Sequence, residues 1–450
     1  MRTELEKLRF NLARLAGCAC ALLALCGLDA GREAHAKAAV VSADGEIIVQ
    51  LRDQAAQVGP LLAKHQLSLI GRFGTRPIYR LKVIGSANLD QKIAALRSEP
   101  VVRFAEPNAL HEGPETRKNV GWAIGDQVPY AAQWALRALG LAEAHRISTG
   151  AGIRVAVLDT GVDRLHPALA GKLLPGFDFV DYDNDPSEGG SAVNRSFGHG
   201  THVAGLVALV APGARIMPLR VLDAEGVGNA WVLAEAMLYA VDPDGNPNTN
   251  DGAQVINLSL STLTKTELFK TVAKLVSCKK RVFGDPDPDE DDDDDSAVSG
   301  NDKVRCSGFG GAVVVAAAGN HGSDKIREYP AAESSKGLIS VAASTSSGAL
   351  AAFSNYGWVK IAAPGENITS TVPGAAYATW SGTSMAAPLV SGAAALLRAA
   401  ERGLTVDKVV KRLTDRGSKL CRTSTRELDL VAALTDTGGK DKPDCTNAAR

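Results

Sequence analysis

The chain has 450 residues, and its 45% hydrophobic content is enough for a large buried core in two or three domains. Its 49 lysines and arginines balance 50 aspartates and glutamates, which leaves a formal net charge of -1. Because the chain carries no excess of positive charge, its composition argues against nucleic acid or an anionic membrane surface as a partner.

The first 36 residues have the order of a secretory signal peptide. A cationic stretch is followed by an apolar run from Leu15 to Leu28 and by an Ala-His-Ala cleavage motif at 34–36. An uncleaved anchor is the alternative, although the apolar run is short for a membrane span. The lipobox-like sequence ending at Cys18 stands at the start of the apolar run, which argues against a lipoprotein. We therefore expect a secreted or periplasmic protein that keeps no membrane segment once the signal is removed.

Residues 37–112 alternate between strand and helix patterns. Alternating apolar residues predict strands at 46–53 and 77–85, helical periodicity predicts helices at 56–67 and 88–100, and 101–108 is predicted as a closing strand. These elements predict a small α+β domain. Residues 113–127 are polar and contain glycine and proline, which is typical of a linker.

From residue 128 to residue 438 strands alternate with helices, the pattern of an α/β domain whose parallel sheet is covered on both faces. Strands are predicted at 153–159, 214–222, 254–261, 312–320 and 337–344. Helices are predicted at 199–211, 229–241, 265–278 and 384–403. Residues 439–450 form a C-terminal tail.

An acidic insert occupies 278–306 within this domain, and a cysteine bounds it at each end. Four cysteines remain after removal of the signal, an even number that indicates two disulfides in an oxidising compartment: Cys278, Cys306, Cys421 and Cys445. Three pairings are open. The simplest joins sequence neighbours and would clip the insert at its base, and free thiols are the alternative. In a right-handed β-α-β unit the insert would lie on the side opposite the carboxyl ends of the strands.

Three motifs stand at strand and helix ends, where an α/β sheet carries its reactive groups. Asp159 ends the strand IRVAVLD, His199 begins a helix in SFGHGTHVAG, and Ser384 begins another in WSGTSMAAP. Each alone is compatible with a helix cap or, for His199 with His202, a metal pair. Because no third ligand motif accompanies the histidines, we interpret His199 as a base and His202 as a packed residue. The order Asp, His, Ser is that of the subtilisin triad.

The chain resembles the subtilisin family of serine peptidases, since D-T-G, H-G-T-H-V-A-G and G-T-S-M-A-A-P look like its three active-site signatures. A-A-A-G-N places Asn320 at the family's oxyanion-hole asparagine. The resemblance implies that Ser384 attacks a peptide carbonyl, His199 transfers the proton, Asp159 orients His199, and the Asn320 amide binds the oxyanion. No cofactor is expected for catalysis. The alternative is a catalytically idle protein that uses the same cleft to bind peptides.

The resemblance also implies where protein or peptide substrates bind. Two segments are expected to pair with the substrate main chain: Ser259, Leu260 and Ser261 on one side, and Ala317, Ala318 and Gly319 on the other. Family members commonly carry glycine in place of Ser261, which leaves the shape of the neighbouring pocket open. The segment 321–330 is expected to shape the primary pocket, and both its acidic and its basic side chains are candidates for it.

Residues 37–112 resemble the family's inhibitory propeptide. This resemblance implies an intramolecular inhibitor that the enzyme removes by a cut between Leu110 and Gln127. Two acidic stretches, 181–185 and 242–252, have the alternating oxygen side chains that suit calcium. Plain turns explain the same composition, so a structural calcium ion and an ordinary loop both remain open.

Overall fold

The computed structural model describes residues 42–53, 56–113, 123–125, 128–246, 249–277, 311–335, 337–421 and 423–439. The predicted signal peptide, the acidic insert and residues 440–450 of the tail lie outside these ranges. Within the ranges, no helix combines the length and the apolar character needed to cross a membrane.

The N-terminal residues form the expected α+β domain. Its antiparallel sheet has the order β2-β3-β1-β4, from strands β1 (Ser42–Leu51), β2 (Leu67–Arg72), β3 (Ile78–Val83) and β4 (Val102–Glu112). Its helices are α2 (Gly59–His65) and α3 (Leu89–Arg97). The sequence pattern does not predict β2, because most of its side chains are exposed and show no alternation.

The two faces of this sheet have different neighbours. Alternate residues of β1, including Ile47 and Val49, pack with Leu61 and Leu96 of the two helices. The other face, with Ile48, belongs to a core shared with Trp231 in α8 (Ala230–Val241). Strand β4 also pairs with β9 (Val227–Asn229), so the N-terminal sheet gains a fifth strand from the larger domain.

A nine-stranded sheet forms the centre of the larger domain, with the order β16-β17-β13-β12-β11-β10-β6-β8-β7. All its neighbouring strands are parallel except β16 and β17. The strands are β6 (Arg154–Asp159), β7 (Phe177–Asp178), β8 (Arg215–Arg220), β10 (Val255–Leu258), β11 (Val313–Ala317), β12 (Leu338–Ser344), β13 (Ile361–Pro364), β16 (Ser418–Lys419) and β17 (Arg426–Glu427). The predicted α/β class is confirmed.

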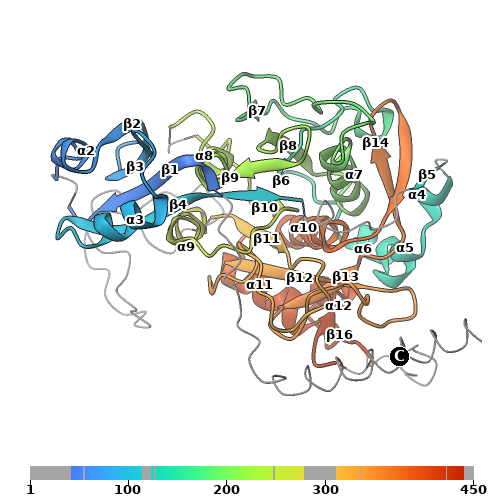
Figure 1. Ribbon diagram of the computed structural model, residues 1–450. Coiled ribbons are helices and arrows are strands. Elements are labelled where there is room, and N and C mark those ends of the chain that lie inside the picture. The colour runs from blue at the N-terminus through green and yellow to red at the C-terminus, as the bar shows by residue number, and fades with distance from the viewer. Residues whose placement is uncertain are drawn as a thin grey trace, which may run out of the picture. The chain divides into compact units, whose positions relative to one another are not determined.

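Helices cover both faces of this sheet (Figure 1). Val155 and Val157 of β6 share a core with α7 (His199–Val210) and α10 (Thr383–Ala400), whereas Ala156 and Leu158 face α8 and α9 (Glu267–Val276). The remaining helices are α4 (Val128–Ala132), α5 (Trp134–Ala138), α6 (Leu141–Ile147), α11 (Val406–Asp415), α12 (Leu430–Thr435) and a 3-10 turn (Pro167–Leu169).

A third, three-stranded sheet corrects one sequence prediction. Strand β5 (Ala123–Gly125) lies within the segment expected to be a linker, 113–127, and pairs with β15 (Ala376–Trp380) next to β14 (Ile368–Val372). The partner of β5 is some 250 residues away in the sequence, so no local pattern could indicate the pairing.

The register of the central strands brings the predicted motifs to one edge. Leu258 of β10 is level with Leu158 of β6 and with Ala316 of β11. The residues that follow each strand therefore leave the sheet side by side. At the opposite edge, the Ala312 amide donates to the Val276 carbonyl at 2.8 Å, so the described flanks of the acidic insert meet at the amino ends of the strands.

Candidate active site

Asp159 and His199 form a buried hydrogen-bonded pair. Asp159 ends β6, and its Oδ1 lies 2.7 Å from Nδ1 of His199, the first residue of α7. Oδ1 also accepts from the Thr160 amide at 2.8 Å. Because an ionised carboxylate only accepts, Nδ1 carries the proton and Nε2 is the basic nitrogen.

The close approach of α7 to Asp159 depends on a glycine and a second carboxylate. A Cβ on Gly200 would overlap the carbonyl oxygen of Gly161 and crowd Asp159. The Gly200 amide donates to Thr160 Oγ1 at 2.9 Å, and that hydroxyl donates in turn to Glu188. Glu188 also accepts from the amide and hydroxyl of Thr201 at 3.0 and 2.6 Å. Desolvation raises the pKa of Glu188 to about 7 despite these donors.

His202 has the packing role that the sequence predicts. Its ring is fully buried, stacks on Trp380 with centroids 4.4 Å apart, and lies with Nε2 3.1 Å from the Ala378 carbonyl. Burial, with a smaller effect of neighbouring His199, lowers the pKa of His202 to about 3. The ring is therefore neutral at physiological pH. Trp380 also stacks against His199, with centroids 6.3 Å apart.

Ser384 stands in the first turn of α10 and is tied to the end of β10. Its Oγ donates to the Ser259 carbonyl at 3.2 Å, while Ser259 Oγ donates to the Ser384 carbonyl at 2.9 Å. Asn257 supports the pair, since its Nδ2 donates to Ser259 Oγ at 3.0 Å. Helix-start amides point at this site and favour negative charge there.

Asn320 follows β11 and is held by the residue before Ser384. Its Oδ1 accepts from both the amide and the hydroxyl of Thr383, each at 3.0 Å. Thr383 Oγ1 also accepts from the Gly319 amide at 3.0 Å. Because the amide oxygen is engaged on one side, the Nδ2 donor of Asn320 is directed to the other. The sequence did not single out Thr383, Trp380 or Glu188, whose importance depends on these tertiary contacts.

The first of the two predicted substrate segments pairs with the N-terminal domain. The Glu112 amide donates to the Ser261 carbonyl at 3.0 Å, and the Ser261 amide donates to the Glu112 carbonyl at 2.9 Å. The segment residues Ser259, Leu260, Ser261, Ala317 and Ala318 are completely buried. The four candidate catalytic side chains, Asp159, His199, Asn320 and Ser384, are each at most 3% exposed.

Residues 150–429 match the family model described as "Subtilase family". The chain belongs to the subtilase family. A second family model, that of the fervidolysin N-terminal prodomain, matches residues 32–108. The chain is accordingly a subtilisin-like serine proteinase preceded by a prodomain, as its sequence motifs indicated.

Individual subtilases agree with this assignment. The thermophilic serine proteinase of Bacillus sp. (strain AK1) is 34% identical over 85% of this chain and 84% of its own length. Thermitase of Thermoactinomyces vulgaris is 34% identical over 66% of this chain and 93% of its own. The crystal structure of fervidolysin from Fervidobacterium pennivorans superposes with a TM-score of 0.66 at 23% identity, over 88% of this chain and 61% of that one. This last likeness concerns the fold.

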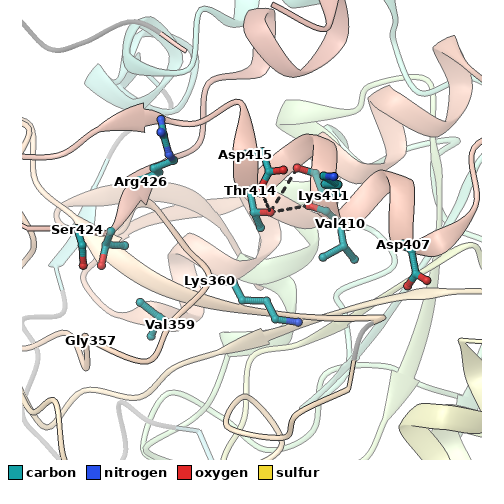
Figure 2. A pocket seen from close by; sticks show the side chains of 11 residues that line it. Gly357, Val359, Lys360, Asp407, Val410, Lys411, Thr414, Asp415, Ser424 and Arg426 are labelled. Carbon is teal, nitrogen blue, oxygen red and sulfur yellow. Dashed lines mark hydrogen bonds between the residues drawn. The ribbon is translucent and has the colours of Figure 1, made fainter. Parts of the chain in front are cut away.

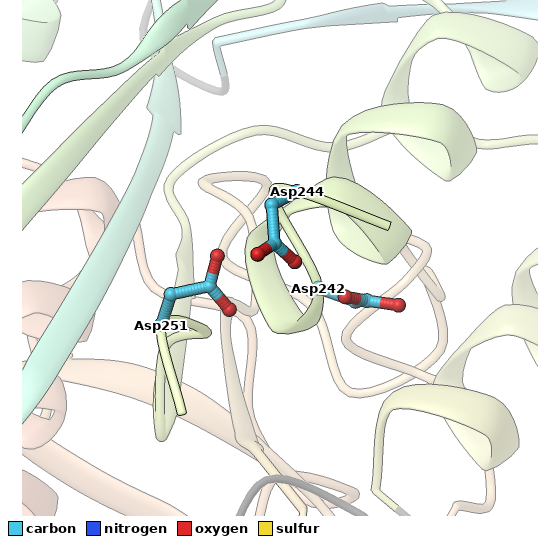
Figure 3. A group of neighbouring side chains, drawn as sticks. All are labelled: Asp242, Asp244 and Asp251. Atoms are coloured by element: carbon cyan, nitrogen blue, oxygen red, sulfur yellow. The ribbon is translucent and has the colours of Figure 1, made fainter. Parts of the chain in front are cut away.

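The two acidic stretches of this subtilase differ in structure. Asp242, Asp244 and Asp251 are neighbours (Figure 3), and one carboxylate oxygen from each lies within 4.8 Å of those from the other two. Burial, followed by the charges of Asp251 and Asp244, raises the pKa of Asp242. In the other stretch Asp181 instead pairs with Arg220 at 2.5 Å.

A pocket elsewhere in the fold contains none of the candidate catalytic or substrate-binding residues (Figure 2). It lies between α11 and two loops and mixes charges of both signs. Its lining residues are Gly357, Val359, Lys360, Asp407, Val410, Lys411, Thr414, Asp415, Ser424, Thr425 and Arg426. We assign it no role.

Proposed function

We propose that this subtilase is an endopeptidase that works through Asp159, His199 and Ser384. The observation that carries the proposal is the 2.7 Å contact between His199 Nδ1 and Asp159 Oδ1, which fixes the tautomer a general base requires. Ser384 attacks the scissile carbonyl and gives its proton to His199 Nε2. His199 then gives that proton to the leaving amine as the C–N bond breaks, which leaves an acyl-enzyme on Ser384. Water, activated by His199 in the same way, hydrolyses the acyl-enzyme and restores the Ser384 hydroxyl.

The oxyanion of the tetrahedral intermediate would be bound by Asn320 Nδ2 and the Ser384 amide. The support is that Thr383 donates two hydrogen bonds to Asn320 Oδ1. These bonds orient the Nδ2 group of Asn320 before the reaction begins. Removing one such donor typically costs about 3 kcal/mol of transition-state stabilisation. The chemistry needs no cofactor.

Labelling with a fluorophosphonate probe tests the catalytic assignment. We expect one label on Ser384 in the processed protein and none in the Ser384→Ala variant. Absence of labelling in processed, folded protein would favour the alternative function, an idle peptide-binding protein.

We propose further that the protein is made as a zymogen whose residues 37–112 occupy the cleft until the enzyme cuts between Leu110 and Gln127. The pairing of Glu112 with Ser261 supports this, since it uses the hydrogen bonds proposed for a substrate. Residues 128–438 would then be the catalytic domain. N-terminal sequencing of wild type beside Ser384→Ala tests it, and equally short chains in both would contradict self-processing.

Export of the protein with removal of residues 1–36 is also proposed, on the strength of the signal-like sequence. Material recovered from the medium or periplasm should not begin at Met1 and should lack residues 1–36. Disulfide formation fits the same compartment, and Cys421 is a disulfide-bonded cysteine whose partner lies outside the described residues. Mass analysis of unreduced peptides would identify the pairs.

A structural calcium ion is proposed at Asp242, Asp244 and Asp251. The mutual proximity of the three carboxylates supports it, because a cation would relieve their repulsion. Chelation should speed thermal inactivation of wild type and have no effect on Asp251→Asn. The matched control Asp183→Asn should respond like wild type, and a wild type indifferent to chelation would contradict the proposal.

A further inference from the structure

Glu328 is a completely buried carboxylate between the two segments proposed to bind the substrate main chain. On one side its Oε2 accepts a hydrogen bond from Ser261 Oγ. On the other side a Cβ added to Gly319 would overlap the carboxylate. The Glu328 carboxylate therefore lies against both segments.

Several contacts hold this carboxylate in place. Its Oε1 accepts from His321 Nδ1 at 2.7 Å and from Asn355 Nδ2 at 3.1 Å. Asn355 Nδ2 also donates to the Ala318 carbonyl at 2.8 Å, which links Glu328 to the second segment. The next residue, Tyr329, exchanges main-chain hydrogen bonds of 2.8 and 2.9 Å with Thr262, beside Ser261.

Glu328 has no lysine or arginine partner among the described residues, and the basic group beside it is the His321 imidazole, whose Nδ1 lies 2.7 Å from Oε1. Basic side chains of the same segment lie elsewhere, since Arg327 lies over the Trp358 ring, 5.1 Å from its centroid, and Lys325 is exposed. Burial of a carboxylate without a full cationic partner is costly. A cation brought by a substrate would offset that cost.

The distance from the nucleophile suits a long side chain. Ser259, whose carbonyl accepts from Ser384 Oγ, is two residues before Ser261, whose hydroxyl binds Glu328. Two residues of extended chain span about 7 Å. Lysine and arginine place a cation at the end of a stem of this length, and the arginine fork also matches a carboxylate.

We propose that Glu328 makes this protease select arginine or lysine at the residue immediately before the scissile bond. The inference rests on the proposed catalytic site and on the two substrate segments as the walls of the pocket. Ser261, which stands where family members commonly carry glycine, acts as a positioning residue for the carboxylate.

The test uses mature enzyme and peptide p-nitroanilides that differ only in the last residue: arginine, lysine, phenylalanine or leucine. We expect wild type to prefer arginine over phenylalanine by about 100-fold in kcat/KM, and Glu328→Gln to lose most of that ratio. The control Glu333→Gln removes another buried carboxylate of the same region and should keep the wild-type ratio. A wild-type preference for phenylalanine or leucine would overturn the proposal, as would an unchanged ratio in Glu328→Gln.

A wild-type digest of a proteome-derived peptide library tests the same preference without any variant, so a misfolded Glu328→Gln leaves it testable. Cuts that follow arginine and lysine support the proposal. Cuts elsewhere, in enzyme that is labelled by the fluorophosphonate, overturn the specificity and leave the catalytic proposal standing. Absence of both cuts and labelling overturns the two together.

Discussion

Glu112 and Ser261 exchange two main-chain hydrogen bonds, with N–O distances of 3.0 and 2.9 Å. Glu112 is the last residue of β4, whose preceding residues pair with β9. The end of the prodomain strand is therefore attached to the catalytic domain on two sides. An extended peptide bound between the same two partners would have the same main-chain pairing, so under the proposed function the prodomain and a substrate would compete for one set of donors and acceptors.

The prodomain residue Asn108 caps a helix of the protease, and this contact should strengthen inhibition of the protease by the prodomain. Asn108 is fully buried, and its Oδ1 accepts from the Trp231 amide in the first turn of α8 at 3.0 Å. The Asn108→Ala prodomain, added to mature protease, should inhibit about fivefold more weakly, because loss of a cap costs about 1 kcal/mol. The inhibition constant, measured with a peptide substrate, checks this. Exposed Ser68→Ala is the control, and equal constants for all three prodomains would contradict the prediction.

Thr383→Val should lower kcat about tenfold and leave KM nearly unchanged. The substitution removes the hydroxyl that donates to Asn320 Oδ1 and accepts from the Gly319 amide, so the Asn320 amide is less well aimed at the developing oxyanion. Thr383→Ser keeps the hydroxyl and should retain most activity. Steady-state kinetics decide the matter, and a valine variant as fast as wild type would show that the hydroxyl does not orient Asn320.

Gly319→Ala should destabilise the folded protein by about 2 kcal/mol or more. Gly319 has φ +95°, where side chains are strained, and its Cβ would overlap the Glu328 carboxylate. Thermal unfolding in the Ser384→Ala background avoids self-digestion. At Gly403 a Cβ meets nothing within 4 Å, so Gly403→Ala should change the stability by no more than about 0.5 kcal/mol. Similar melting temperatures for the two variants would disprove the steric argument.

His202 should make the fold sensitive to acid. Its folded pKa of about 3 lies below the ordinary value of 6.5, so below pH 6.5 the unfolded chain binds a proton that the folded chain does not. Stability therefore falls as the pH decreases from 6.5 toward 3, by up to about 1.4 kcal/mol per pH unit. The His202→Gln variant, whose amide can still donate to Ala378, should lack this one-proton contribution, so its free energy of unfolding should fall less steeply with decreasing pH. Urea unfolding in the Ser384→Ala background measures it, and equal slopes would refute it.

The sequence predicted those parts of the site that depend on short-range pattern. Asp159, His199 and Ser384 stand at strand or helix ends that periodicity and flanking glycines indicate, whereas Asn320 was placed by the resemblance of A-A-A-G-N to the subtilisin family. In the structure, in-register parallel strands carry the residues after β6, β10 and β11 to one edge. This convergence follows from fold class alone, which is why the α/β prediction and the motif positions agree.

Contacts between distant segments could not be predicted in this way. In the sequence, Glu328 was one charged residue among several in the segment 321–330. The orientation of its side chain depends on the Thr262–Tyr329 pairing and on the absence of a side chain at Gly319. Trp380 is defined as a neighbour of His199 and His202 by its position in the sheet that includes β5. Neither the contacts of Glu328 nor those of Trp380 can be recognised from the periodicity of the sequence.

The hydrogen bond between the Ala312 amide and the Val276 carbonyl makes the end of α9 and the start of β11 a permissive junction. Since Val276 and Ala312 are hydrogen-bonded neighbours, the entropic cost of joining these ends grows only slowly with the number of residues between them. We therefore expect that sequences of very different length can be exchanged there without moving the helix, the strand or the residues at the opposite edge of the sheet. The junction is a natural place to attach a reporter or an affinity tag to an active protease.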